Sequence, residues 1–98
     1  MKKLTKLEVT TKLKRLSGWK IVKGRNAITK SFKFNSFFSA FNWMTAIAFY
    51  AEQQNHHPEW SNVYNSVDVT LSTHDSGGVT QLDIKMAKQM NLLAKKKV

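Results

Sequence analysis

Residues 35–54 read NSFFSAFNWMTAIAFYAEQQ, a run without glycine or proline that decides the fold. Asn35-Ser36 is a typical helix N-cap, and Pro58 disfavours a helical conformation at the residue before it. We therefore expect a long central helix that ends near Gln54, with its aromatic residues in the core. Apolar residues recur at helical spacing and predict the stripe that faces this core: Phe37, Phe41, Met44 and Ala48, widened by Phe38, Thr45 and Phe49.

The residues before this helix predict a shorter helix and a β-hairpin. Leucines near helical spacing over about residues 3–16 predict an amphipathic helix, which Ser17-Gly18 terminates. Residues 19–23 and 27–34 alternate between apolar and polar side chains and are rich in β-branched and aromatic types. Because Gly24-Arg25-Asn26 separates the two runs, we expect antiparallel strands joined by a tight turn.

The residues after the central helix predict a second hairpin and a last helix. NVYNSVDVTLST at residues 62–73 alternates as a pair of strands does, with a turn near Asn65-Ser66. Thr80-Gln81-Leu82-Asp83 has the spacing of a capping box, which predicts a helix that runs to about Leu93. A frayed basic tail is expected over about residues 94–98.

The predicted order is therefore α-β-β-α-β-β-α. Strands that are apolar on one face and polar on the other suit a sheet that is covered on one side only. We expect an α+β fold, in which a four-stranded antiparallel sheet carries its helices on one face. A chain of this length fits one domain, which we place over residues 1–98.

Lysine and arginine outnumber aspartate and glutamate by 16 to 6, which gives a formal net charge of +10. The cations lie towards the two ends, because residues 34–84 contain no lysine or arginine but five of the six acidic residues. A site in this middle region would not recognise phosphates through salt bridges. The chain has no cysteine, which excludes disulfides and thiolate sites. No apolar run suits a signal peptide or a membrane span, so we expect a cytoplasmic protein, with presence in the nucleus left open.

The chain has only three histidines, His56, His57 and His74, and each falls in a predicted loop or at a strand end. A rigid scaffold usually presents functional groups at such positions. Glu52 lies four residues before His56, a spacing that brings two side chains together on a helix. Histidine beside carboxylates suits acid–base chemistry near neutral pH, so the sequence predicts an acid–base site around these residues.

Less specific interpretations of the same residues stay open. The three histidines could be unrelated surface residues, or they could bind zinc with water as a fourth ligand. No HxH or HxxxH pair supports a metal site, and we expect none. Asp83 could do no more than cap a helix, and Gly77-Gly78 is expected to shape a turn. Trp60 and Tyr64 flank the histidine loop and are candidates for the wall of a pocket.

A set of residues at fixed spacing resembles the pterin-4a-carbinolamine dehydratase family: Glu52, His56-His57-Pro58, Tyr64, His74 and Asp83. The shared pattern is an acidic residue, three residues, His-His-Pro, five residues, an aromatic residue, nine residues, His, eight residues and Asp. Every spacing of the pattern is met without a gap. The resemblance extends over about residues 18–93, which is most of the chain.

The resemblance implies a hydro-lyase that dehydrates 4a-hydroxytetrahydrobiopterin to quinonoid dihydrobiopterin, a step in tetrahydrobiopterin regeneration. Such a reaction needs a general acid and a general base but no metal and no cofactor. The catalytic residues that it implies are His56, His57, His74 and Glu52, with Glu52 orienting or charge-stabilising His56. The residues expected to bind the pterin are Asn55, His56, His57, Pro58, Trp60, Ser72, Thr73, His74 and Asp75. Tyr64 and Asp83 are motif residues with a structural role.

The resemblance also implies a homodimer or a homotetramer. Some animal relatives act as dimerisation cofactors of a homeodomain transcription factor, through a helix surface that otherwise forms tetramers. A dimerisation or transcriptional cofactor is therefore one alternative function. A basic nucleic-acid-binding module is another, because a charge of +10 attracts polyanions in a salt-dependent way. We expect no membrane partner and no specific nucleic-acid partner.

Overall fold

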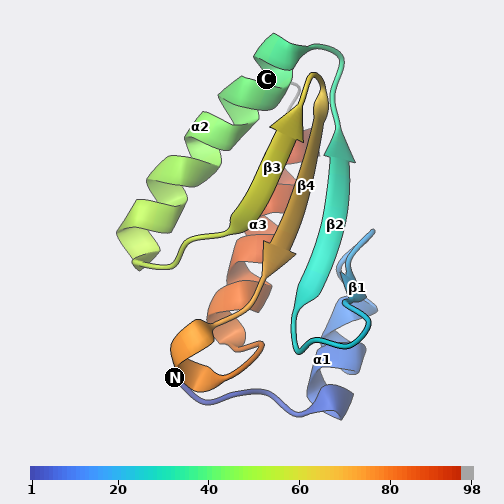
Figure 1. Ribbon diagram of the computed structural model, residues 1–98, viewed down its shortest axis with the longest axis vertical. Helices are drawn as coiled ribbons and strands as arrows, with labels where there is room; N and C mark the ends of the chain where they lie inside the picture. Colours follow the sequence, from blue (N-terminus) through green and yellow to red (C-terminus); the bar gives the residue numbers. More distant parts are fainter. Residues whose placement is uncertain (96–98) are drawn as a thin grey trace.

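An antiparallel sheet in the strand order β1-β2-β4-β3 forms one layer of the molecule, and helices pack against it (Figure 1). The computed structural model describes residues 1–95. In chain order the elements are α1 (Lys6–Leu13), β1 (Lys20–Ile21), β2 (Ile28–Lys33), α2 (Phe37–Gln54), β3 (Glu59–Val63), β4 (Ser66–Leu71), the 3₁₀ turn η1 (His74–Ser76) and α3 (Gln81–Lys95). The predicted α+β fold and the predicted order of helices and strands are confirmed.

The central helix α2 begins at the predicted cap, Ser36, and ends at Gln54, as the sequence predicts. The hydroxyl of Ser36 accepts a hydrogen bond from the backbone N–H of Ser39 at 3.0 Å. Asn55 ends the helix in the left-handed conformation, with φ 50° and ψ 43°. This reversal turns the chain out of the helix directly before the two adjacent histidines.

The face of α2 that packs on the sheet differs from the predicted one. The buried residues of α2 are Ala40, Trp43, Ile47 and Ala51. Trp43 confirms its predicted place in the core, and Met44 is partly buried against that core. The aromatic residues of the predicted stripe are exposed instead, with exposed fractions of 50% for Phe37, 74% for Phe38, 53% for Phe41 and 71% for Phe49. Both faces of this helix are apolar, so spacing alone could not choose between them.

Packing around Trp43 explains which face is buried. Its indole Nε1–H donates to the carbonyl oxygen of Met90 in α3 at 3.1 Å, so the polar edge of the ring is satisfied inside the core. Its ring centroid lies 4.5 Å from that of Phe32 in β2 and 6.1 Å from that of Trp60 in β3. Ala40 is a small residue on the same face and lets the helix backbone approach its neighbours closely. These contacts join α2, α3 and the sheet in one core.

Lys30 lies on the helix-facing side of β2 and links that strand to two other parts of the fold. Its Nζ donates to the carbonyl oxygen of Ser17, after α1, and to Oδ1 of Asn91 in α3, both at 2.8 Å. The same ammonium lies 4.6 Å from the centroid of the Phe32 ring. Burial lowers the pKa of Lys30, and the nearby charge of Lys95 lowers it further. Lys30 therefore connects the segment after α1 to the sheet and to α3.

Several boundaries differ from the predicted ones by a few residues. The first helix is shorter than residues 3–16, β1 is shorter than residues 19–23, and the turn between β3 and β4 lies at Tyr64–Asn65. Residues 94 and 95 of the predicted tail belong to α3, and residues 96–98 lie outside the described residues. No helix within residues 1–95 has the length and apolar character that crossing a membrane requires.

Replacing Ile47 by Ala tests which face of α2 is packed. Ile47 is fully buried, so Ile47→Ala should lower the free energy of unfolding by about 2–5 kcal/mol. Leu7→Ala is the matched control: it removes as many carbon atoms from a side chain that is 75% exposed, and should change stability by no more than about 0.5 kcal/mol. Urea unfolding of both variants makes the comparison. Equal losses in the two variants would contradict the observed packing.

Candidate active site

Three segments that are distant in sequence meet at one end of the sheet (Figure 1). They are the loop after α2, the end of β4 with η1, and the beginning of α3. Antiparallel pairing of β3 with β4 causes this arrangement, because Glu59 at the start of β3 pairs with Thr70 near the end of β4. The two histidines before β3 are thereby brought next to the histidine that follows β4.

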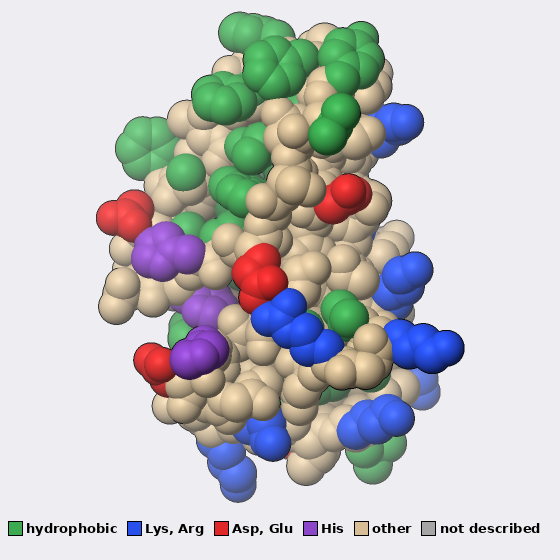
Figure 2. Space-filling view, viewed as in Figure 1, with side chains coloured by type: hydrophobic (Ala, Val, Ile, Leu, Met, Phe, Trp, Pro, Cys, Tyr) green, Lys and Arg blue, Asp and Glu red, His purple; other side chains and the backbone are tan. Residues whose placement is uncertain are grey.

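A pocket of about 370 Å³ opens where these segments meet, within the range of small-molecule sites. Its lining residues are Met1, Asn55, His56, His57, Ser72, Thr73, His74, Asp75, Ser76 and Leu82. All three histidines of the chain therefore line one pocket, together with Asn55 and residues 72–75. Figure 2 shows the histidines gathered on one face with acidic side chains beside them.

His56 contacts the buried carboxylate of Asp83. Its Nε2 lies 2.6 Å from Oδ1 of Asp83, and both residues are buried, with Asp83 fully inaccessible. The other oxygen of Asp83 accepts a hydrogen bond from Oγ1 of Thr73 at 2.8 Å and another from the backbone N–H of Thr80 at 2.9 Å. Because Nε2 is engaged with the carboxylate, Nδ1 is the ring nitrogen that remains for a ligand. A carboxylate in this position fixes the orientation of an imidazole and stabilises its protonated form.

Glu52 has a different partner from the predicted one. Its Oε1 lies 2.7 Å from Nε2 of His57, and no contact joins it to His56. The prediction was wrong because it assumed helical spacing as far as His56, whereas the helix ends at Asn55 and the chain reverses there. The side chains of His57 and Glu52 are 55% and 80% exposed, so this pair is far better solvated than that of His56.

His74 has a third kind of environment. It begins η1, and its side chain is fully exposed, as is that of its neighbour Asp75. Nδ1 of His74 lies 3.6 Å from Oδ1 of Asp75, a distance too long for a hydrogen bond. The pocket thus combines one histidine that is fixed by burial, one that contacts an exposed carboxylate, and one that is open to solvent.

Hydrogen bonds between Thr73 and Gly78 shape the loop that carries His74. The N–H of Thr73 donates to the carbonyl oxygen of Gly78 at 2.8 Å, and the N–H of Gly78 donates back at 3.3 Å. Gly77 takes the left-handed conformation with φ 76°, which favours glycine at this position. The prediction that Gly77-Gly78 shapes a turn is confirmed.

An ion pair beside the pocket joins the β1–β2 turn to the start of β3. Both guanidinium nitrogens of Arg25 contact the carboxylate of Glu59, one of them at 2.8 Å. The hydrogen bond from Arg25 lowers the pKa of Glu59 and, in return, raises the pKa of Arg25. A second hollow of about 240 Å³ lies along this pair and shares Ser72 and His74 with the histidine pocket.

Five predicted site residues do not line the pocket, among them Asp83, which is fully buried and contacts His56. Trp60 packs against Trp43 and Tyr64 is exposed at the β3–β4 turn, so the prediction that these two form a pocket wall was wrong. Pro58 and Glu52 also lie outside the lining. Trp60 was misplaced because it faces the helices, as the alternation of β3 requires once the strand begins at Glu59.

Sequence reasoning missed other features of the site. Met1, Ser76 and Leu82 line the pocket without any pattern that marks them. Asp83 accepts the N–H of Thr80, as the helix-capping interpretation expects, but its contact with His56 was not predicted. The residue type of Asp83 could have indicated this contact, because a carboxylate in the first turn of a helix can accept from both a backbone N–H and a side chain. Within residues 1–95, no group of three or more histidine, aspartate and glutamate side chains is arranged to hold a metal ion.

Comparison with protein families gives one match. The profile described as "Pterin 4 alpha carbinolamine dehydratase" matches residues 2–93. The provisionally named pterin-4-alpha-carbinolamine dehydratases of Brucella ovis and Brucella canis are each 56% identical to this chain over 92 residues. The match covers 94% of this chain and 95% of each relative.

The fold of this chain also superposes on solved structures of similar proteins. The crystal structure of a transcriptional coactivator/pterin dehydratase from Brucella melitensis superposes with a TM-score of 0.93 at 56% identity. That match covers 94% of this chain and 98% of the other. A pterin dehydratase-like protein identified as a RuBisCO assembly factor in the alpha-carboxysome superposes with a TM-score of 0.68 at 20% identity, over 79% of this chain and 89% of the other. This second likeness concerns the fold alone.

The two carboxylate–histidine pairs can be tested separately by NMR. Asp83→Asn should shift the ring signals of His56 and leave those of His57 in place, because only His56 contacts Asp83. Glu52→Gln is the matched control, since it also replaces a carboxylate by its amide, and should shift the signals of His57 alone. Imidazole ¹H–¹⁵N spectra of the folded variants give the measurement. A shift of His56 in the Glu52 variant would restore the pairing that the sequence predicted.

Proposed function

The chain belongs to the pterin 4 alpha carbinolamine dehydratase family, and on this basis we propose that it dehydrates 4a-hydroxytetrahydrobiopterin to quinonoid dihydrobiopterin. The observation that carries this proposal is the convergence of three histidines on one pocket, with a buried carboxylate behind one of them. In the cell this activity would serve the regeneration of tetrahydrobiopterin.

The proposed reaction removes water from two adjacent atoms of the pterin. The bond between C4a and its hydroxyl oxygen breaks, the N5–H bond breaks, and a double bond forms between C4a and N5. The leaving hydroxyl takes a proton from a general acid, and a general base accepts the proton from N5. No electrons are gained or lost overall, so acid and base groups suffice and the reaction needs neither metal nor redox cofactor.

His56 is suited to accept the N5 proton. Its imidazole gains a positive charge in that step, and the buried carboxylate of Asp83 lies 2.6 Å away to stabilise it. His74 is suited to protonate the leaving hydroxyl, because its full exposure lets it exchange protons with water between turnovers. His57, which is paired with Glu52, would orient the pterin or act as a second acid–base group.

The remaining polar groups of the pocket would bind the pterin edge. Asn55 lines the pocket and directly precedes the two adjacent histidines, and Ser72 and Thr73 line it from the end of β4. These residues offer amide, hydroxyl and backbone groups, which match the alternating donors and acceptors of a pterin ring. Asp75 adds a carboxylate that accepts hydrogen bonds from amino and ring N–H groups. Glu52 acts on the pterin only through His57 in this arrangement.

We also propose that the chain forms a homodimer or a homotetramer. The side chains of four phenylalanines stay exposed on α2, and we refer to them as the α2 phenylalanines: Phe37, Phe38, Phe41 and Phe49. Apolar side chains dominate the upper end of the molecule in Figure 2. An apolar patch of this kind on a small protein usually marks an interaction surface. The same surface could bind another protein, as the coactivator description of the Brucella melitensis relative suggests.

A stopped-flow assay with 4a-hydroxytetrahydrobiopterin tests the proposed activity. The purified protein should dehydrate this substrate faster than the uncatalysed reaction, and exhaustive chelation should leave its rate unchanged. His56→Ala and His74→Ala should each lower the single-turnover rate at least about tenfold, since acid–base groups contribute about 10²–10⁴-fold. The double variant should lose much less than the product of the two single effects, because the residues act as one unit.

Thr10→Ala is the control for these variants, because Thr10 is exposed on α1 and lies outside the pocket. All variants are compared at unchanged circular dichroism. Histidine variants as active as this control would mean that the histidines are unrelated surface residues. Loss of activity after chelation, with recovery on adding zinc, would replace acid–base catalysis by metal catalysis.

Light scattering tests the proposed self-association. The wild type should exceed its monomer mass of 11.3 kDa at micromolar concentration. Phe38→Glu with Phe49→Glu should give monomers, because a charge on each exposed ring position would have to be buried on association. Leu7→Glu places the same charge on α1 and should leave the assembly intact. A wild type that stays monomeric would refute self-association and favour a different partner for the α2 phenylalanines.

A further inference from the structure

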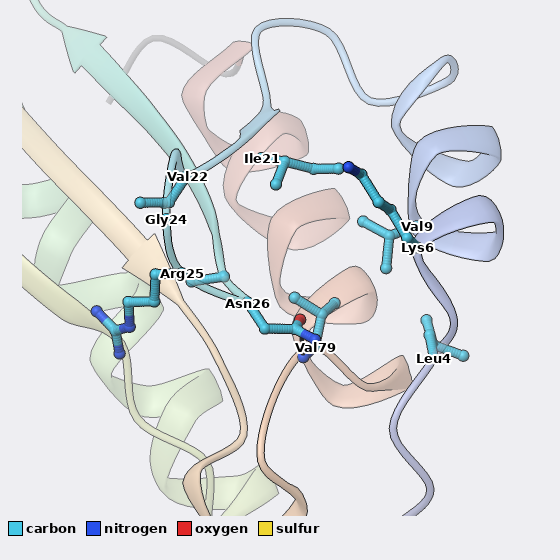
Figure 3. A pocket seen from close by; sticks show the side chains of 10 residues that line it. Leu4, Lys6, Val9, Ile21, Val22, Gly24, Arg25, Asn26 and Val79 are labelled. Carbon is cyan, nitrogen blue, oxygen red and sulfur yellow. Dashed lines mark hydrogen bonds between the residues drawn. The ribbon is translucent and has the colours of Figure 1, made fainter.

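Another cavity, distinct from the histidine pocket and from the hollow along Arg25 and Glu59, lies between α1, the β1–β2 hairpin and the residue before Thr80 (Figure 3). Its volume is about 270 Å³. The residues that line it are Leu4, Lys6, Val9, Ile21, Val22, Gly24, Arg25, Asn26, Ala27 and Val79. None of these residues lines the histidine pocket, so the two hollows are separate.

Buried residues with paired backbone atoms form the floor of this cavity, so it exists without a ligand. Val9, Ala27 and Val79 are almost fully buried and form part of an apolar lining. The polar backbone atoms around them are already paired: the N–H of Leu4 donates to the carbonyl oxygen of Val79 at 2.8 Å, and the N–H of Val22 donates to that of Ala27 at 2.9 Å. The cavity therefore offers apolar contact and few open hydrogen-bonding groups, which suits an apolar molecule.

A single cation stands at the mouth of the cavity. Lys6 is the first residue of α1, and in Figure 3 its side chain crosses the opening towards Ile21. No salt bridge holds Lys6 within residues 1–95, and none of the ten lining residues is acidic. The one carboxylate of α1, Glu8, is occupied by the capping box with Thr5. The other cation of the lining, Arg25, binds Glu59 and points away from the cavity.

The place of Lys6 in the helix makes this charge unfavourable. The N-terminus of a helix carries a partial positive charge, which repels a cation in the first turn and attracts an anion. A negatively charged group at the mouth would therefore be attracted by Lys6, because Glu8 at this end of α1 is held by Thr5. The apolar lining and the unpaired cation at the opening together define an amphipathic ligand.

We propose that this cavity binds a small aliphatic carboxylate, with its hydrocarbon chain against the apolar lining and its carboxylate at Lys6. A volume of 270 Å³ equals the space of about nine water molecules at roughly 30 Å³ each, which suits a ligand of about ten non-hydrogen atoms. Octanoate has this size and charge. Its dissociation constant should fall at about 0.1–1 mM, a moderate efficiency for so small a ligand.

Titration of the full ¹⁵N-labelled chain with octanoate tests this site. The amide signals of Val22, Ala27 and Val79 should shift in a saturable way, and those of the α2 phenylalanines should not. Lys6→Gln should weaken binding about fivefold, the scale of one exposed ion pair. Lys3→Gln is the matched control, because it removes the same charge from outside the lining and should leave the affinity unchanged.

Two further measurements separate this site from general attraction to amphiphiles. Octylammonium, with the same chain and the opposite charge, should bind at least about fivefold more weakly than octanoate. Val22→Phe should fill the cavity and abolish the shifts while the circular dichroism stays unchanged. Equal binding of the two probes, or shifts confined to the α2 phenylalanines, would overturn the proposal. So would an unchanged affinity in the Lys6→Gln variant.

Discussion

The buried carboxylate of Asp83 is the group on which the arrangement of the candidate site depends. It contacts His56 after α2, Thr73 after β4 and the N–H of Thr80 before α3, so one side chain joins the three segments that form the pocket. A charge at a fully inaccessible position is tolerated only when such partners surround it, and losing one costs about 3–5 kcal/mol. Stability of the fold and geometry of the site therefore depend on the same contacts.

This arrangement divides the histidines by their access to water. His56 is positioned by the core and has a fixed orientation, whereas His57 and His74 lie at the exposed side of the pocket. The proposed dehydration needs one group that takes a proton from the substrate and another that gives a proton to the leaving group, and the pocket offers a histidine of each kind. No lysine or arginine side chain lines this pocket, in keeping with the uncharged pterin that we propose as its ligand.

The sequence was sufficient to predict those features of the fold that depend on local residues alone. Ser36 and Pro58 bracket α2, and the alternation in β4 placed its valines inside. It was insufficient where two choices were chemically alike. Both faces of α2 are apolar, and the buried one carries Trp43, which donates to the carbonyl oxygen of Met90 and packs on Phe32 and Trp60. The set of histidines could be predicted from type and spacing. Their partners could not, because the left-handed turn at Asn55 directs His56 to a carboxylate 27 positions away.

We propose that the buried pair of His56 and Asp83, and not the exposed pair of His57 and Glu52, supports acid–base chemistry in this pocket. Single-turnover dehydration rates of Asp83→Asn and Glu52→Gln, measured at equal circular dichroism, test it most directly. The Asp83 variant should lose at least about tenfold in rate, because the charge that stabilises a protonated His56 is gone. The Glu52 variant should stay within about threefold of the wild type, as expected for a solvated pair. A larger loss in the Glu52 variant than in the Asp83 variant would contradict this account.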